Sequence, residues 1–271
     1  PVSPVLNDQF GRRISYVRLS LTDRCDMRCR YCMADTMEFL PRSEILSHEE
    51  IGVLARAFVA RGVTRIRLTG GEPLARRGAV DVARDIGQLL HSGLEELTLT
   101  TNASRLRDHA KGLRDAGIER INISLDTRDP DKFSHVTRLG NLTRVLDGIA
   151  AAKDAGFRIK INRVALNGLN DQEILPMLEW CAEQGFDLSL IETMPLGMID
   201  EDRTDRFLPL TRVQDDIAAR YTLIPSAHRT GGPARYWHVQ ELGNRVGFIS
   251  PLTANFCEGC NRVRVTCTGT L

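Results

Sequence analysis

Short apolar runs and amphipathic stretches alternate along the first two thirds of the chain. The apolar runs predict six strands, at residues 14–21, 63–69, 94–101, 118–125, 157–165 and 186–192. Apolar positions at helical spacing predict the helices between them, after a capping box at Ser47 and over residues 79–91, 105–116, 142–155 and 174–184. Asp129 followed by Pro130 predicts the start of a further short helix. Strands that alternate with helices in this way form parallel βαβ units. The pattern therefore predicts an incomplete, six-unit (β/α)6 TIM-type barrel, with its chemistry at the C-terminal ends of the strands.

The pattern changes after the sixth strand, so we divide the chain into a partial barrel over 1–195 and a C-terminal extension over 196–271. The extension begins with an acidic loop at 200–205 and continues with a short helix that Thr211 is expected to cap. Residues 236–240 and 245–249 predict a hairpin across Gly243. In the barrel, Asn170 is expected to cap the last helix. The chain starts without methionine and stops in what reads as an element, so we expect a fragment of a longer polypeptide.

The composition of the chain limits the kinds of partner that we expect it to bind. A formal net charge of +1 gives no electrostatic reason to expect binding to nucleic acid or to a membrane surface, and no apolar run approaches the length of a membrane span. Seven cysteines, clustered near the two ends with Cys181 between them, are not a disulfide framework. They indicate metal ligation in a reducing compartment, and therefore a cytoplasmic protein.

The first cysteine group is the best candidate site. Cys25, Cys29 and Cys32 have C-x-x-x-C-x-x-C spacing within one short loop. Thiolates bind soft metals, and three on one loop suit an iron–sulfur cluster with one iron left open. A structural zinc loop is the alternative, although closed zinc sites usually have four ligands in two pairs.

The cysteine loop, with the aromatic Tyr31 before its last cysteine, resembles the signature of the radical S-adenosylmethionine (SAM) superfamily. The resemblance implies that SAM binds the open iron of a 4Fe–4S cluster, and that the reduced cluster cleaves SAM to methionine and a 5′-deoxyadenosyl radical. Residues 70–73, Gly-Gly-Glu-Pro, could be a tight turn on their own. Beside the cysteine loop they resemble the superfamily's SAM-binding motif. The polar residues that end the third and fourth strands, among them Thr100 and Ser124, could be helix caps or could bind SAM or substrate.

Three cations lie within predicted strands, namely Arg18, Arg67 and Lys160. The residue pattern alone favours charges that point outward into solvent. If all three instead converged on one cavity, they would suit a polyanion such as a triphosphate.

The second cysteine group, Cys257 and Cys260, is followed by Asn-Arg-Val-Arg. Alone, a C-x-x-C pair could be a zinc half-site, a redox pair or a set of cluster ligands. Following a six-unit radical SAM core, it resembles the GTP 3′,8-cyclase family of molybdenum-cofactor biosynthesis (the MoaA family). The resemblance also covers Thr-Gly-Gly-Glu-Pro-Leu at 69–74, Leu-Thr-Thr-Asn at 99–102 and Ile-Asn-Ile-Ser-Leu-Asp at 121–126.

The family resemblance implies a role for each matching residue. The first 4Fe–4S cluster would be held by Cys25, Cys29 and Cys32. SAM would be bound by Tyr31, Gly71, Ser124 and Met194. GTP would be bound by Arg18, Arg67, Thr100, Lys160, Arg262, Val263 and Arg264, of which Arg262 and Arg264 are also expected to be catalytic. A second 4Fe–4S cluster would be held by Cys257 and Cys260, with its third ligand beyond residue 271, since Cys267 comes too early. Cys181 and Cys267 receive no role.

The implied reaction begins when the radical abstracts the ribose 3′ hydrogen of GTP. The resulting C3′ radical attacks C8 of guanine, and an electron with a proton completes (8S)-3′,8-cyclo-7,8-dihydro-GTP. The partners would be GTP, an external electron donor and the next enzyme of the molybdopterin pathway, and the oligomeric state, a homodimer included, is left open. Two alternatives remain at this point, a radical SAM enzyme that modifies peptides and carries an auxiliary cluster, and a zinc-stabilised binding module.

Overall fold

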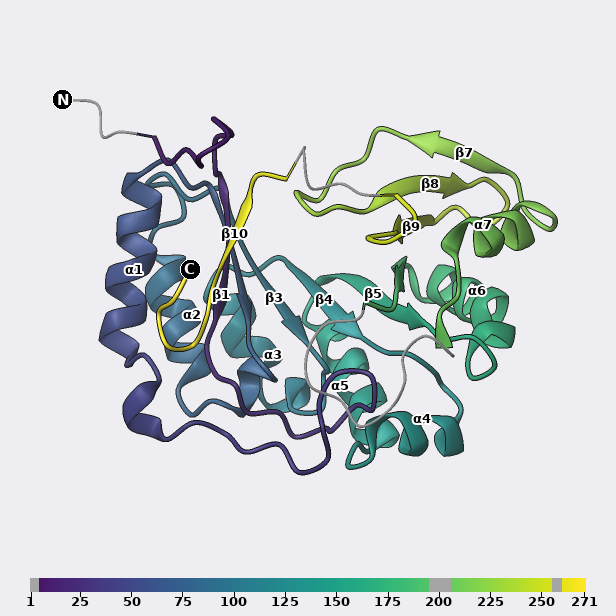
Figure 1. Ribbon diagram of the computed structural model, residues 1–271, viewed down its shortest axis with the longest axis horizontal. Coiled ribbons are helices and arrows are strands. Elements are labelled where there is room, and N and C mark those ends of the chain that lie inside the picture. Colours follow the sequence, from purple (N-terminus) through teal and green to yellow (C-terminus); the bar gives the residue numbers. More distant parts are fainter. Residues whose placement is uncertain (1–4, 195–205, 255–259) are drawn as a thin grey trace.

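The computed structural model describes residues 5–194, 206–254 and 260–271, and one sheet of ten strands runs through these residues (Figure 1). The strand order is β10-β1-β2-β3-β4-β5-β6-β9-β8-β7. The strands are β1 Tyr16–Ser20, β2 Arg65–Thr69, β3 Glu96–Thr101, β4 Arg120–Ser124, β5 Arg158–Ala165, β6 Asp187–Glu192, β7 Leu223–Ser226, β8 Arg235–Val239, β9 Arg245–Ile249 and β10 Arg262–Val265.

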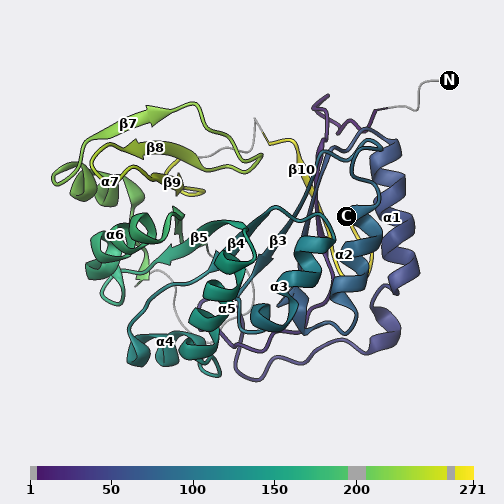
Figure 2. The ribbon, with the colours of Figure 1, turned by 180° about the vertical axis from the view of Figure 1, so that it is seen from behind.

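Six parallel strands, β1 to β6, form the centre of the sheet, and each pairs with the next in chain order. Their helices α1, α2, α3 and α5 pack over one face (Figure 2). The helices are α1 His48–Ala60, α2 Ala79–Gly87, α3 Leu106–Asp115, α4 Pro130–Thr137, α5 Leu142–Asp154, α6 Ile174–Gln184 and α7 Leu210–Ala218. This arrangement confirms the predicted six-unit partial barrel.

The two faces of the sheet differ sharply in polarity because successive side chains of a strand point to opposite sides. The face under the helices holds the apolar core, to which β1 contributes Val17 and Leu19 and β2 contributes Ile66 and Leu68. The intervening positions form the other face, which we call the inner face. Its buried side chains include many polar groups: Arg67, Thr98, Asn122, Lys160 and Ser189.

The C-terminal extension joins both ends of this sheet. The predicted hairpin is confirmed as β8 and β9, which pair antiparallel. β9 also pairs parallel with β6, and β10 pairs parallel with β1 (Figure 1). The sequence pattern missed β7 and β10 as strands. The predicted domain boundary at residue 195 and the acidic loop lie outside the described residues.

The first residues of the helices can be compared with the predicted capping residues. Ser47 forms the predicted capping box, in which its hydroxyl accepts from the Glu50 amide and the Glu50 carboxylate accepts from the Ser47 amide. The side-chain caps predicted at Asn170 and Thr211 are wrong, although Asn170 does occupy the N-cap position of the 3-10 turn Asp171–Glu173 that leads into α6. Asn170 turns its side chain inward to bond backbone groups of residues 126, 164 and 166, and α7 begins after Pro209. α2 ends at Gly87, earlier than predicted, and the Leu89 and Leu90 amides then donate to the carbonyl groups three residues before them, as in turns.

Candidate active site

The three-cysteine loop follows β1 and is held at its start by the carboxylate of Asp26. This carboxylate accepts hydrogen bonds from Asn102 Nδ2 at 2.8 Å, from Ser104 Oγ at 2.6 Å and from Arg105 Nε at 3.2 Å. These donors come just after β3. Asn102 and the residues just after it therefore support the cysteine loop, a role that the sequence alone did not reveal.

The far part of the loop is bonded to the end of α4. The amides of Arg28 and Arg30 donate to the carbonyl groups of Thr137 and Val136, at 2.9 and 3.0 Å. The Arg138 guanidinium returns to the loop and donates to the carbonyl oxygens of Arg28 and Met33. Main-chain bonds thus fix the loop independently of its thiols.

The thiol groups lie close enough to influence each other. Burial raises the pKa of Cys25 to about 12, and burial also raises the pKa of Cys29 well above its usual range. Neighbouring thiolates contribute to both shifts, so three thiolates can coexist here only with a compensating cation. Within residues 5–194, 206–254 and 260–271, no three His, Cys, Asp or Glu side chains are placed so that they could hold a single metal ion. Cluster thiolates each bind a different iron, so three thiols on one held loop fit an iron–sulfur cluster.

The Gly-Gly-Glu-Pro segment after β2 packs directly against the cysteine loop. A Cβ on Gly71 would lie 2.4 Å from the carbonyl oxygen of Arg24 and 2.5 Å from that of Asp23, so only glycine fits. The next residue, Glu72, is buried and accepts from the Leu74 amide, the Thr101 hydroxyl and the Asn102 amide. Burial raises the pKa of Glu72 to about 7. Glu72 is thus a structural link that we did not predict.

The other predicted SAM contacts lie at the same edge of the sheet. Ser124 is the exposed last residue of β4, and Met194 follows β6 and is 40% exposed. The Tyr31 hydroxyl lies 2.6 Å from the carboxylate of Asp126, just after β4. The C-terminal ends of β1, β2, β4 and β6 therefore bring all four residues to one edge.

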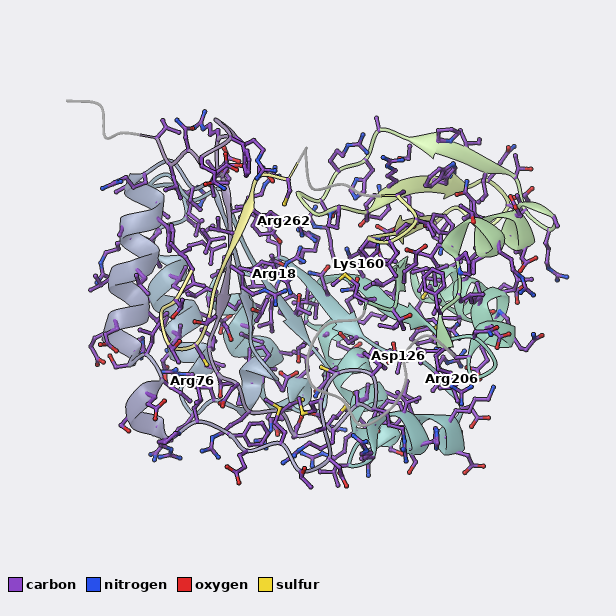
Figure 3. All side chains as sticks on the ribbon, in the orientation of Figure 1. Arg18, Arg76, Asp126, Lys160, Arg206 and Arg262 are labelled. Carbon is purple, nitrogen blue, oxygen red and sulfur yellow. The ribbon has the colours of Figure 1, made fainter. Side chains whose placement is uncertain are left out.

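The predicted GTP-binding cations share the inner face. In the pairing of β10, β1 and β2, Arg264, Arg18 and Arg67 stand side by side. Arg67 is 7% exposed and Lys160 is 5% exposed, so the sequence-based interpretation of these two as solvated, outward-pointing charges is wrong. Arg18, Arg262 and Lys160 lie near the centre of Figure 3.

The cations of the inner face repel one another, so holding them together is electrostatically unfavourable unless an anion binds among them. Burial, followed by the charges of Arg264 and Arg67, lowers the pKa of Arg18 to about 10. Burial also lowers the pKa of Lys160, whose Nζ lies 3.1 Å from the Tyr236 hydroxyl. Among the described residues, Arg18 Nε, Arg67 Nε, Arg67 Nη2 and Thr100 Oγ1 are buried and have no hydrogen-bond partner. Polar groups in this condition indicate a site built for a polar, negatively charged ligand.

The end of the chain completes the inner face. Arg262 pairs with Tyr16 across β10 and β1, and Val263 lies between the two arginines of β10. Cys260 precedes the strand and is partly buried, whereas Cys257 lies outside the described residues. Cys267 is buried, and its carbonyl oxygen accepts from the amide of Leu46, two residues before α1.

Sequence reasoning missed two further members of the inner face. The ring of Tyr16 lies under Arg67, with 5.3 Å between the guanidinium carbon and the ring centroid. Arg120 forms an ion pair of 2.7 Å with Glu96. Both stand two residues along a strand from another residue of the inner face, so strand alternation was the signal that could have identified them.

The sequence matches two family descriptions that together span most of the chain. Residues 19–181 match the radical SAM superfamily, and residues 186–271 match Molybdenum Cofactor Synthesis C. The chain belongs to the radical SAM superfamily, whose members use SAM with a 4Fe–4S cluster. Solved structures agree in fold. SuiB of Streptococcus suis bound to S-adenosylmethionine has a TM-score of 0.61 at 18% identity, covering 76% of this chain and 48% of SuiB. Hexahistidine-tagged anSMEcpe with bound AdoMet has a TM-score of 0.60 at 15% identity, covering 75% of this chain and 56% of that one.

Curated relatives narrow the family. The protein named GTP 3′,8-cyclase in Erythrobacter litoralis (strain HTCC2594) is 60% identical over 98% of this chain and 80% of its own length. The GTP 3′,8-cyclase of Paracoccus denitrificans (strain Pd 1222) is 54% identical over 98% of this chain and 78% of its own length. Within the radical SAM superfamily, the chain belongs to the GTP 3′,8-cyclase family, as its motifs indicated.

No helix in the described parts of the chain has the length and apolar character needed to cross a membrane.

Proposed function

We propose that this chain cyclises GTP to (8S)-3′,8-cyclo-7,8-dihydro-GTP, the first step of molybdopterin biosynthesis. Family membership supports the proposal, because curated relatives with this activity in their names are 54–60% identical over nearly the whole chain. The structural observation that supports it most is the inner face, where Arg18, Arg67 and Lys160 gather with no carboxylate of the described residues bonded to any of them.

A nucleoside triphosphate would supply the missing negative charge. Arginine can bind phosphate oxygens with two parallel N–H groups, and lysine acts as a point charge. The unpartnered N–H groups of Arg18 and Arg67 are therefore proposed to bind phosphate, with Arg264 beside them. Thr100 would contribute its unpartnered hydroxyl, while Arg262 and the main chain of Val263, whose side chain packs against the apolar core, would contact the nucleotide from β10.

The radical would be generated at the adjoining edge of the sheet. Cys25, Cys29 and Cys32 would hold the 4Fe–4S cluster. When bound, this cluster and SAM supply the one-electron chemistry that removes the ribose 3′ hydrogen and allows C3′ to bond to C8. Gly71, Ser124, Tyr31 and Met194 would bind SAM at the strand ends. Because this edge adjoins the cationic face, the chain would hold the two ligands next to each other.

A second 4Fe–4S cluster is proposed at Cys257 and Cys260, with a third ligand beyond residue 271. Cys260 lies two residues before Arg262, so a group bound there would adjoin the inner face. The guanine base would be anchored at this position. An external electron donor would supply the reducing equivalents, and the product would pass to the next enzyme of the molybdopterin pathway.

The decisive experiment is anaerobic incubation of the iron-loaded protein with GTP, SAM and dithionite. We expect 5′-deoxyadenosine together with the cyclised nucleotide. SAM cleavage with no cyclised nucleotide, when GTP is present, would contradict the proposal. Nucleotide binding by calorimetry gives a second test, because a peptide-modifying enzyme should ignore GTP.

Substitutions separate the two metal sites. Cys29→Ala should abolish SAM cleavage, because two thiolates cannot hold the cluster in its required geometry. Cys260→Ala should stop cyclisation while uncoupled SAM cleavage continues. Equal loss of both activities in Cys260→Ala would mean that the second cysteine pair is structural.

Substitutions on the inner face test the triphosphate site. Charge-assisted hydrogen bonds contribute about 1.5–3 kcal/mol each, so Lys160→Ala should weaken GTP binding by roughly ten- to a hundred-fold. Guanosine, which has no phosphates, should bind both proteins almost equally. Unchanged GTP affinity in Lys160→Ala and Arg67→Ala would place the triphosphate elsewhere.

A further inference from the structure

Tyr31 reaches into the protein from the cysteine loop, and a buried carboxylate binds its hydroxyl. The phenolic oxygen lies 2.6 Å from Asp126 Oδ2, a short distance typical of a charge-assisted hydrogen bond. Asp126 is 7% exposed. Any aromatic ring could fill the space beside the cysteines, but only tyrosine can make this bond.

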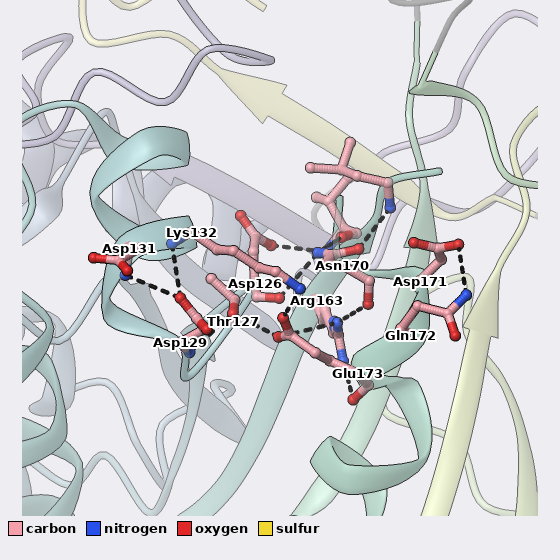
Figure 4. A network of polar contacts seen from close by, with 12 residues as sticks. Asp126, Thr127, Asp129, Asp131, Lys132, Arg163, Asn170, Asp171, Gln172 and Glu173 are labelled. Carbon is pink, nitrogen blue, oxygen red and sulfur yellow. Dashed lines mark hydrogen bonds and ion pairs between the residues drawn. The ribbon is translucent and has the colours of Figure 1, made fainter. Parts of the chain in front are cut away.

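Other segments of the chain hold Asp126 in place through hydrogen bonds, so the carboxylate that binds Tyr31 has a fixed position. Its second carboxylate oxygen accepts from the Val164 amide at 2.9 Å. Its main-chain carbonyl accepts from Asn170 Nδ2, also at 2.9 Å. Asn170 is completely buried, donates also to the Val164 carbonyl oxygen and accepts from the Leu166 amide. Arg163, also completely buried, donates to the carbonyl oxygen of Asn170 (Figure 4). Asp126 therefore cannot follow the loop if the loop moves.

The fixed end belongs to the strands that carry the proposed substrate contacts. Val164 is in β5, the strand that also carries Lys160, and Asp126 follows β4, whose last residue is Ser124. One carboxylate thus connects the cysteine loop with β4 and β5. Asp26 and the end of α4 also hold the loop, but neither of these contacts involves β5.

We propose that Asp126 is a positioning residue, and that the Tyr31–Asp126 hydrogen bond sets the place of the cysteine loop relative to β4 and β5. This placement would couple SAM cleavage to cyclisation, because a radical formed at the loop would meet the ribose bound on the inner face. This inference rests on the proposed function. A misplaced loop would still carry its three thiols, but SAM cleavage would no longer lead reliably to cyclisation.

The test compares Tyr31→Phe, Asp126→Asn and the double variant. Phenylalanine keeps the ring and leaves the bonds from Asp126 to Val164 and Asn170 intact. We expect iron content to remain at the wild-type level, and the ratio of 5′-deoxyadenosine to cyclised nucleotide to rise at least three-fold in both single variants. The double variant should be no worse than either single one, because both substitutions remove the same charge-assisted bond: phenylalanine removes the donor, and asparagine removes the charge of the acceptor.

Amide hydrogen exchange gives a second readout, measured on the protein before iron is loaded. Loss of a charge-assisted bond should make exchange within residues 27–33 about ten- to a hundred-fold faster in Tyr31→Phe. Exchange in α1, which lies at the opposite end of the molecule from α4 (Figure 1), should not change. This arm needs no turnover, so it remains informative if the wild type makes no cyclised nucleotide and the proposed function fails.

Asp129→Asn is the matched control. The Asp129 carboxylate caps α4 by accepting from the amides of Asp131 and Lys132, and these bonds do not involve Tyr31. Asparagine caps a helix about as well as aspartate does, so this variant removes one carboxylate charge near the loop and keeps α4, whose last residues bond the loop, in place. Both the ratio and the exchange of the loop should therefore stay unchanged. The proposal is overturned if Tyr31→Phe keeps the wild-type ratio and exchange rate, if the two substitutions act additively, or if Asp129→Asn produces the same changes. Should Asp126→Asn fold poorly, Tyr31→Phe decides the question alone.

Discussion

Replacing Arg67 with methionine should stabilise the ligand-free protein, although it removes a residue proposed to bind substrate. Arg67 is 7% exposed, and its Nε and Nη2 have no hydrogen-bond partner among the described residues. Each unpaired buried donor costs about 1–3 kcal/mol, so the two together cost about 2–6 kcal/mol. The contact with the Tyr16 ring offsets only about 0.5–2 kcal/mol of this.

Methionine retains the methylene groups and the packing of the side chain but removes the charge. We therefore expect the free energy of unfolding to rise by about 1–4 kcal/mol, the range seen when buried ionic groups are replaced by well-packed apolar ones. For a chain of this size each kcal/mol raises Tm by about 2–4 °C. Differential scanning calorimetry without ligand measures this shift directly.

Arg120→Met is the control, since it removes a similar side chain from the same face. Arg120 is paired with Glu96, to which its Nη2 and Nε donate at 2.7 and 3.0 Å. Its loss leaves Glu96 without that partner, so Tm should fall. GTP at a hundred times its Kd should stabilise the wild type by about 2.7 kcal/mol and Arg67→Met by much less. A Tm of ligand-free Arg67→Met equal to or below that of the wild type would refute the reasoning.

Three further predictions concern other parts of the site. Burial lowers the pKa of Lys160 below the usual value of about 10.4. Between the lowered pKa of the folded protein and the usual pKa of the unfolded chain, the unfolded chain binds one more proton than the folded protein. The free energy of unfolding should therefore rise with pH over this range, and Lys160→Met should abolish the rise in urea titrations. GTP affinity should fall over the same alkaline range. Gly71→Ala would place a Cβ 2.4 Å from the Arg24 carbonyl oxygen and should reduce iron uptake on reconstitution, whereas Gly232→Ala, with its nearest atom 3.6 Å away, should not. Asp26→Ala removes three hydrogen bonds and should lower the free energy of unfolding by about 2–3 kcal/mol in the same urea assay.

Regular patterns in the sequence predicted the centre of the fold because each strand and helix there is long enough to show its period. Residues 14–21 and 63–69, for example, contain β1 and β2 with only small errors at their ends. The short strand β10 alternates arginine and valine over four residues, too few to distinguish a strand from a loop. Its place beside β1 depends on tertiary pairing, which no local pattern records.

The candidate site was predictable where residue types are chemically specific. Three cysteines on one loop indicate metal ligation whatever surrounds them. Arg67 and Lys160 were misjudged because a lone cation in a strand is usually solvated, and burial follows from which face the strand presents. Glu72 and Asp26 were missed because their function is to hold other segments, and their partners at residues 101–105 are distant in sequence.

The pairing of β10 with β1 has a consequence for how the chain reaches its native state. Asn261 Nδ2 donates to Ser15 Oγ at 2.7 Å, a contact between residues 246 positions apart. A ribosome must therefore complete nearly the whole described chain before β1 gains its second neighbour, and closing so large a loop is slow. Until then β1 is an edge strand with unpaired amide and carbonyl groups, which can template association with another chain. Truncation before residue 262 should consequently yield a protein that aggregates during synthesis, even though all six central strands are present.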